Sequence, residues 1–289
     1  MATPGLHHIV HAVRDLDAAA DTYARLGFMV GAPNRHPWGT CNRVVQFDGS
    51  YIEVLGVAEP DKIPLGTVRS FSFGAFNRDF LANHEGLSMV ALESRDARAD
   101  AEAFRTAGIG DFDVFDFTRE GRRPDGTVVR LAFSLVFAAD PQAPEAGFFT
   151  CQEYHPESFW NPASQVHPNG AAAMAGLIVV AEEPERHRAF LSALTGGAEI
   201  RTAAAGITVT MARGTIQVID PAAFRSQLGI APPDTARGPR LAALRFAVRD
   251  IAASIGALKR ADVTAQVRMG RIVVGPDVAM GATMMLEPG

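Results

Sequence analysis

The sequence predicts an α+β protein in which four βαβββ modules pair into two domains with curled, mainly antiparallel sheets. Four times along the chain an apolar, strand-like phrase leads into a helix-like phrase that has a capping residue at its start or glycine at its end. After each helix come short β-rich phrases separated by Gly, Pro or Asp turns. The period is too long for a solenoid repeat, so it indicates duplicated structural modules.

The first two modules begin with clear strand and helix signals. The first has a strand over 6–13, then a helix over 17–26 that ends at Gly27. The second has a strand over 87–92, a helix that Asp96 caps and a stop at Gly108. Both continue into β-rich phrases, at 43–47 in the first module and at 128–137 in the second.

The last two modules repeat this order. The third begins at 177–181 and has a helix that Pro184 starts, and the fourth begins at 244–248 and is capped by Asp250. A stretch rich in turn formers, 160–170, separates the two pairs. We therefore expect an N-terminal domain over 1–160 and a C-terminal domain over 172–289, since 289 residues are enough for two domains.

Composition excludes several classes of partner. The formal net charge is −5 and no basic stripe occurs, so we expect no nucleic-acid partner. No apolar run reaches the roughly 20 residues that cross a bilayer, so we expect no membrane partner and a cytoplasmic protein. The two cysteines, Cys41 and Cys151, are too few for a disulfide framework.

Two residues in the first module suggest a metal site. His8 lies in the first strand of the module and Glu53 in the last, both among apolar neighbours. A βαβββ unit can bring these two strands side by side, so imidazole and carboxylate could meet on one concave surface. The alternatives are a hydrogen-bonded core histidine and a glutamate on the solvent face of an antiparallel sheet.

The segment 6–57 resembles the opening module of the vicinal oxygen chelate superfamily, which includes glyoxalase I, bleomycin-resistance proteins and extradiol dioxygenases. The closest resemblance is to its glyoxalase-like domain proteins. With the alignment anchored on Arg14-Asp15-Leu16, the ligand positions of that superfamily fall on His8 and Glu53. The phrase 148–153 is similar to the end of the second module in such proteins, which often have His where this chain has Glu153.

The resemblance implies a cup that holds a divalent ion (Zn, Ni, Mn or Fe). In the second module the first-strand ligand position falls near Ser88 or Met89, and neither is a strong ligand for a hard ion. We therefore expect Glu153 to complete a set with His8 and Glu53, and the two glutamates to be the catalytic carboxylates.

The C-terminal half lacks such a set. Its corresponding strands contain no His, and Gln217 and Glu287 each stand alone at last-strand positions. We expect this half to be vestigial and either to support the first half or to form a homodimer contact.

A loop and a strand end supply the expected substrate pocket. Residues 35–43 predict a pocket rim, although a plain turn with a packing Trp explains them equally well; the pocket candidates are His36, Trp38, Cys41, Asn42, Arg43 and Cys151. The charged segment 119–126 is most simply a solvated hairpin connection, with an anion contact through Arg122 or Arg123 as the alternative.

The sequence favours a metal-dependent lyase or isomerase that acts on a small substrate with neighbouring oxygens. The rival is a metal-free protein of the bleomycin-resistance type that binds a planar compound through Trp38, Phe47, Phe149 and Trp160. An extradiol-type dioxygenase is less favoured, because two histidines and a carboxylate suit iron and only one histidine is well placed. The chain has no nucleophile elbow, phosphate loop, dinucleotide fingerprint or His-Glu-x-x-His helix.

Overall fold

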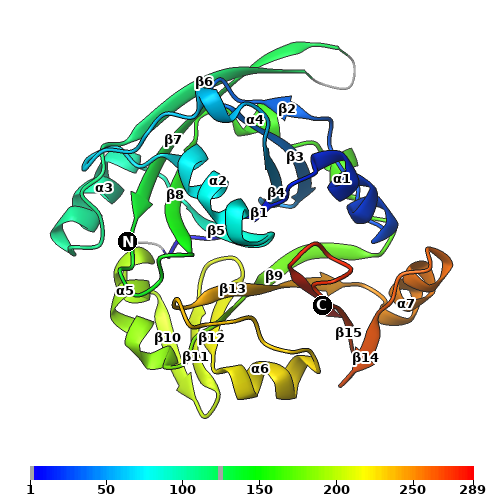
Figure 1. Ribbon diagram of the computed structural model, residues 1–289. Helices are drawn as coiled ribbons and strands as arrows, with labels where there is room; N and C mark the ends of the chain where they lie inside the picture. The colour runs from blue at the N-terminus through cyan, green and yellow to red at the C-terminus, as the bar shows by residue number, and fades with distance from the viewer. Residues whose placement is uncertain (1–2, 123–125) are drawn as a thin grey trace.

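The computed structural model describes residues 3–122 and 126–289 and contains two eight-stranded sheets (Figure 1). Each sheet is made of two βαβββ modules, which confirms the predicted α+β architecture. In Figure 1 the N-terminal half forms the upper part of the molecule and the C-terminal half the lower part.

The first sheet has the strand order β2-β3-β4-β1-β5-β8-β7-β6. Its strands are β1 (Leu6–Ala12), β2 (Asn34–Arg35), β3 (Thr40–Phe47), β4 (Ser50–Val57), β5 (Gly86–Glu93), β6 (Phe115–Arg122), β7 (Val128–Ala138) and β8 (Gly147–Glu153). The second sheet has the equivalent order β10-β11-β12-β9-β13-β16-β15-β14. Its strands are β9 (Ala171–Val180), β10 (Glu199–Ala203), β11 (Gly206–Thr210), β12 (Thr215–Ile219), β13 (Arg240–Val248), β14 (Gln266–Arg268), β15 (Arg271–Val274) and β16 (Thr283–Pro288).

The pairing places the first and last strands of each module side by side. In the first module β1 runs parallel to β4, with His8 opposite Tyr51 and Val10 opposite Glu53. The first strands of the two modules, β1 and β5, are antiparallel neighbours at the middle of the sheet. Most other pairs are antiparallel, so the sheet curls around a concave face instead of forming a doubly wound parallel sheet.

Aspartates begin the module helices where the sequence predicts them. Asp15, Asp96 and Asp250 accept backbone N–H groups at the starts of α1 (Leu16–Arg25), α3 (Ala97–Thr106) and α7 (Ile251–Arg260). Each cap satisfies donors that the first helical turn leaves without intrahelical partners. The third module begins differently, with η3 (Pro184–His187) leading into α5 (Arg188–Leu194).

Two helices lie between modules and were not predicted. These are α2 (Phe73–Asn83), which Ser72 caps, and α6 (Pro221–Leu228), which Asp220 caps. Phe73 of α2 packs into the apolar cluster of the first concave face, and Phe224 of α6 packs into that of the second. The remaining short helices are η1 (Pro60–Lys62), α4 (Pro156–Phe159) and η2 (Pro162–Gln165).

The two sheets share one apolar core on the faces opposite their concave sides. Phe28, Phe47 and Phe246 meet there, with Phe246 coming from the C-terminal half. Across the described residues, no helix has the length and apolar character that a membrane crossing requires. The division into domains over 1–160 and 172–289 remains our proposal; the first sheet ends with β8, and β9 opens the second.

Candidate functional site

The concave face of the first sheet lines a pocket that is partly open to solvent; its empty space of about 510 Å³ includes that open solvent. Strand residues of alternate positions face it, as the period of two in a β-strand requires. The lining is largely aromatic and comes from both modules and α2: His8, His36, Trp38, Asn42, Val44, Tyr51, Glu53, Phe73, Phe117, Arg119, Phe133, Leu135, Phe149, Cys151 and Phe159.

A wider groove leads from this inner cavity to the surface. Gly31, Gln46 and most of the segment 157–164 line it. Val44, Arg119 and Phe159 line both spaces, so they form the neck between the groove and the inner cavity.

His8 and Glu53 converge in the inner cavity as the sequence predicts. Both side chains are buried, and His8 Nε2 lies 3.9 Å from Glu53 Oε2. The His8 ring stacks on Tyr51 at 4.4 Å between centroids and meets the edge of Phe149, so its orientation is fixed. Burial lowers the pKa of His8 well below its usual value, with His7 as a second cause, so the imidazole is neutral at pH 7.

A chain of polar contacts holds Glu53. Asn42 Nδ2 donates to Glu53 Oε1 at 2.6 Å, and His36 Nε2 lies 3.3 Å from the same amide nitrogen. His36 Nδ1 in turn lies 2.7 Å from Thr40 Oγ1. Burial raises the pKa of Glu53 to about 7, against the opposing effects of the Asn42 hydrogen bond and the Arg119 charge. The carboxyl group is therefore positioned for exchange of a proton near neutral pH.

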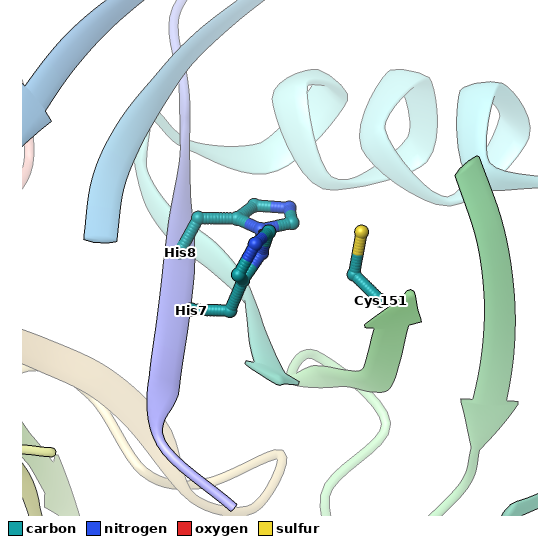
Figure 2. Close-up of side chains that lie close together, drawn as sticks. All are labelled: His7, His8 and Cys151. Atoms are coloured by element: carbon teal, nitrogen blue, oxygen red, sulfur yellow. The ribbon is translucent and has the colours of Figure 1, made fainter. Parts of the chain in front are cut away.

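His7 joins this site because β1 carries a bulge. The pairing of β1 with β5 shifts between Leu6 and His8, so His7 is an extra residue relative to its partner strand. A bulge breaks the strict alternation of side chains, and His7 Nδ1 lies 2.8 Å from His8 Nδ1. One ring donates and the other accepts. Figure 2 shows both rings directed to the same side of β1 as the Cys151 thiol on β8.

His7, His8 and Cys151 form a group whose donor atoms lie within 4.8 Å of one another. Two imidazole nitrogens on one tetrahedral zinc lie about 3.3 Å apart, given Zn–N bonds of roughly 2.0 Å. The histidine nitrogens at 2.8 Å instead have a hydrogen-bond separation. Burial raises the pKa of the Cys151 thiol well above its ordinary value, followed by the charges of Glu153 and Glu53, so this thiol is protonated at neutral pH.

Glu153 lies next to the inner cavity instead of in its lining. Trp160 Nε1 donates to Glu153 Oε2 at 2.9 Å, while Oε1 is buried with no hydrogen-bond partner among the described residues. Burial raises the pKa of this carboxyl group to about 7, and the neighbouring Glu157 adds to the rise.

The expected pocket residues divide between the two faces of the sheet. His36, Trp38, Asn42 and Cys151 line the inner cavity. Cys41 and Arg43 alternate with Asn42 on β3 and face the other side, where Arg43 donates to Asp17 Oδ1 at 2.8 Å. The sequence predicts a loop over 35–43, but its last four residues belong to β3, where side chains alternate between the two faces.

The four aromatic residues expected to bind a planar compound in a metal-free protein do not all lie in the cup. Trp38 and Phe149 line the inner cavity and Trp160 lines the groove, but Phe47 packs between the sheets against Phe246. In the second module, Met89 lies in the apolar cluster of the cup and accepts from Asn77 Nδ2 at 3.4 Å.

Arg119 is a cavity residue that the sequence did not reveal. The charged segment predicted only a hairpin connection, but its first residues belong to β6. Arg119 follows Phe117 by two positions on this strand, so both side chains face the cavity. A strand signal extending into a charged segment is weak, since Arg and Glu are common in loops. Arg123 and the side chain of Arg122, the anion-contact candidates, lie outside the described residues.

The C-terminal half has an ion pair at the corresponding strand ends. Glu287 is buried and accepts from Arg245 Nη2 at 2.5 Å, with Arg271 Nε 3.4 Å away. Gln217 lies on β12. Glu287 is thus paired with cations, unlike Glu53, which faces a neutral imidazole and an amide.

Residues 6–195 match the model of a family described as the glyoxalase-like domain. The chain belongs to this glyoxalase-like domain family. The resemblance to the vicinal oxygen chelate superfamily is thereby confirmed for family and fold. None of the curated proteins matches the sequence.

Solved structures share this fold across the whole chain at low identity. A hypothetical protein from Staphylococcus aureus superposes with a TM-score of 0.66 and 13% identity, covering 99% of both chains. A mutant of 4-hydroxymandelate synthase from Streptomyces coelicolor superposes with a TM-score of 0.60 and 13% identity, covering 99% of this chain and 93% of that one. The 2,2',3-trihydroxybiphenyl 1,2-dioxygenase from Sphingomonas wittichii superposes with a TM-score of 0.55 and 12% identity, covering 100% of this chain and 91% of that one. At these identities the likeness concerns the fold alone.

Proposed function

We propose that the N-terminal cup is the active site of a divalent-metal-dependent lyase or isomerase that acts on a small substrate with neighbouring oxygen atoms. The observation that supports this most is the convergence of His8 Nε2 and Glu53 Oε2, 3.9 Å apart on adjacent strands inside a largely aromatic cavity.

The donor set fits a divalent ion. The other nitrogen of His8 is engaged by His7, and the other oxygen of Glu53 is engaged by Asn42. Such outer contacts are typical of metal ligands, because they fix the tautomer and direct the remaining lone pair. His8 and Glu53 would hold the ion, and Cys151 is a further donor in the same cavity lining. A histidine and a carboxylate suit Zn, Ni, Mn or Fe.

The chain's own residues would supply binding and proton transfer. When bound, the ion would polarise a substrate oxygen as a Lewis acid. The phenylalanines of the lining exclude water and hold a flat substrate body. Glu53 and Glu153 both have pKa values of about 7, which suits a group that removes and returns a proton. Glu53 lines the cavity and Glu153 lies next to it, so we assign metal binding and proton transfer to Glu53, with Glu153 as a neighbouring carboxyl group that supports the site.

Calorimetric titration tests this proposal. Zn²⁺, Ni²⁺ and Mn²⁺ should each be titrated into the wild type, His8→Ala and Glu53→Gln. At least one ion should bind the wild type and should bind each variant at least tenfold more weakly, because each substitution removes one of few ligands. Glu199→Gln, an exposed residue of the C-terminal half, is the matched control and should bind like the wild type. Equal heats in all four proteins would refute the metal site.

A metal-free binding protein is the second candidate, and the aromatic lining favours it. Trp38 stacks on His36 and meets Phe117 edge to face in the cavity lining, and such aromatic surfaces suit a planar compound. The absence of metal heats together with tight binding of planar compounds in the presence of a chelator would support this function. The dioxygenase stays less favoured, because His7, the additional histidine, is hydrogen-bonded to His8 instead of facing Glu53.

A further inference from the structure

Arg119 is the one permanent cation among the described residues that line the inner cavity. It is half-buried on β6, and its guanidinium donates to Asn34 Oδ1 at the long distance of 3.5 Å. Within the described residues no carboxylate oxygen lies within 4 Å of it, although Glu53 lies in the same cavity. Every other half-buried arginine among the described residues has a carboxylate partner within 4 Å, as Arg43 and Arg245 do.

The position of Arg119 points to a ligand. It lines both the outer groove and the inner cavity, at the neck that joins the two spaces. A guanidinium removed from bulk water and left without a carboxylate is costly, and a bidentate carboxylate compensates for that cost well. A single guanidinium matches a monoanion, whereas a phosphate dianion calls for more donors.

Trp38 adds a second donor to the same cavity. Its indole Nε1–H is buried and has no hydrogen-bond partner among the described residues. Its ring packs against Phe117, which precedes Arg119 by two positions on the inward face of β6. Buried polar groups normally have partners, so an orphaned donor in a cavity wall favours a ligand that carries an acceptor.

We propose that the cup selects small carboxylic acids with a flat apolar body, and that Arg119 binds the carboxylate at the neck while the body lies among the aromatic residues within. This rests on the proposed function only in taking the cup as the binding site; it does not require the metal. Arg119 is therefore a specificity-determining residue, and Glu53 and His8 lie beyond it, where the reacting end of the ligand would be placed.

The test compares trans-cinnamate with its neutral analogue trans-cinnamamide by calorimetry in the presence of EDTA. The two compounds share a flat body and differ in charge. The wild type should bind cinnamate roughly tenfold or more tightly than cinnamamide, since hydrogen bonds between charged partners are stronger than those to a neutral amide. Arg119→Gln should bind the two equally, with cinnamamide affinity unchanged, and Arg119→Lys should keep part of the preference because it retains the charge without the bidentate geometry.

Arg201→Gln is the matched control, because it removes the same charge from an exposed site in the C-terminal half. It should show the wild-type preference. The proposal is overturned if the wild type does not prefer cinnamate, if it binds neither compound, or if Arg119→Gln and Arg119→Lys both keep the full preference. Tighter binding of phenyl phosphate than of cinnamate would also overturn it. Because EDTA is present throughout, a failed metal titration leaves this result unaffected, and a failure here leaves the metal result unaffected.

Discussion

At the scale of single residues, Glu53 links the site to the stability of the fold. Burial disfavours the charged form of its carboxyl group and raises the pKa in the folded protein to about 7, from an ordinary value of 4.5. A carboxyl group with a raised folded pKa stabilises the fold below its unfolded pKa, and that contribution is lost as the pH rises through the folded value. The relevant window is therefore pH 4.5 to about 7.

We expect Glu53→Gln to become more stable relative to the wild type as the pH rises across this window. The relative change should approach roughly 3 kcal/mol, since one pKa unit corresponds to about 1.4 kcal/mol. Urea unfolding at several pH values in EDTA measures it. Glu199→Gln, whose carboxylate is exposed, should follow the wild type; a constant difference between wild type and Glu53→Gln would contradict the raised pKa.

The two cysteines should differ in reactivity. Cys151 is buried and its thiol pKa is raised well above the ordinary value, whereas Cys41 is half-buried with a smaller rise, caused first by burial. Because the thiolate is the reactive form, native protein at pH 8 should be alkylated by iodoacetamide slowly at Cys41 and not measurably at Cys151. Peptide mass spectrometry distinguishes the two sites, and both should react in urea. Fast labelling of native Cys151 would contradict the burial of its thiol.

At the scale of secondary-structure elements, each helix cap contributes separately to the free energy of unfolding. Asp15 Oδ1 accepts the backbone N–H groups of Asp17 and Ala18 at the start of α1. Asp15→Ala should lower the free energy of unfolding by about 1 kcal/mol, because it leaves those donors without this partner. Asp15→Ser should recover most of the loss in urea unfolding. Asp21→Ala, within the same helix, is the control and should change stability little.

The bulge in β1 is the element that the period of two could not reveal. Alternation predicts that His7 and His8 face opposite sides, and the extra residue brings both rings into contact. Nothing in the dipeptide distinguishes a regular strand from a bulged one, since the shift depends on how β5 pairs with β1. The hydrogen bond between His7 and His8 therefore results from the way in which β1 and β5 pair.

At the scale of the whole molecule, we propose that the C-terminal half carries no catalytic site and supports the first half. Its β11–β12 hairpin contacts the start of β1, where Leu6 N donates to Arg213 O at 2.8 Å. From β13, Phe246 packs against Phe28 and Phe47. The support is thus physical contact through the core and through backbone hydrogen bonds.

Substitutions in the C-terminal half should separate stability from binding. Gln217→Ala and Glu287→Ala should both leave metal affinity within error of the wild type. Glu287→Ala should also lower the free energy of unfolding by about 3 kcal/mol or more, because it leaves the largely buried Arg245 without its carboxylate. Calorimetry and urea unfolding measure the two properties. Loss of metal binding in either variant would show that the metal site lies in the C-terminal half, against our proposal.

The sequence by itself determined the modular fold, and it predicted His8 and Glu53 as neighbours on one concave surface while a solvent-facing Glu53 stayed open as the alternative. Strand and helix periods are local, and the Asp caps and Gly stops mark element ends without reference to the rest of the chain. The parallel pairing of β1 and β4 is a property of a βαβββ unit and brings the two strands side by side, whereas the inward position of Glu53 was decided by the tertiary structure.

Only the tertiary structure decided the rest of the site. It placed His7 beside His8 through a bulge, turned Cys41 and Arg43 away from the cup, and brought Arg119 into it from the second module. It also held Glu153 against Trp160 instead of in the cavity lining. These outcomes depend on how strands far apart in the sequence pair and curl, and on which side chains then fill the concave face, which are long-range effects that no local pattern encodes.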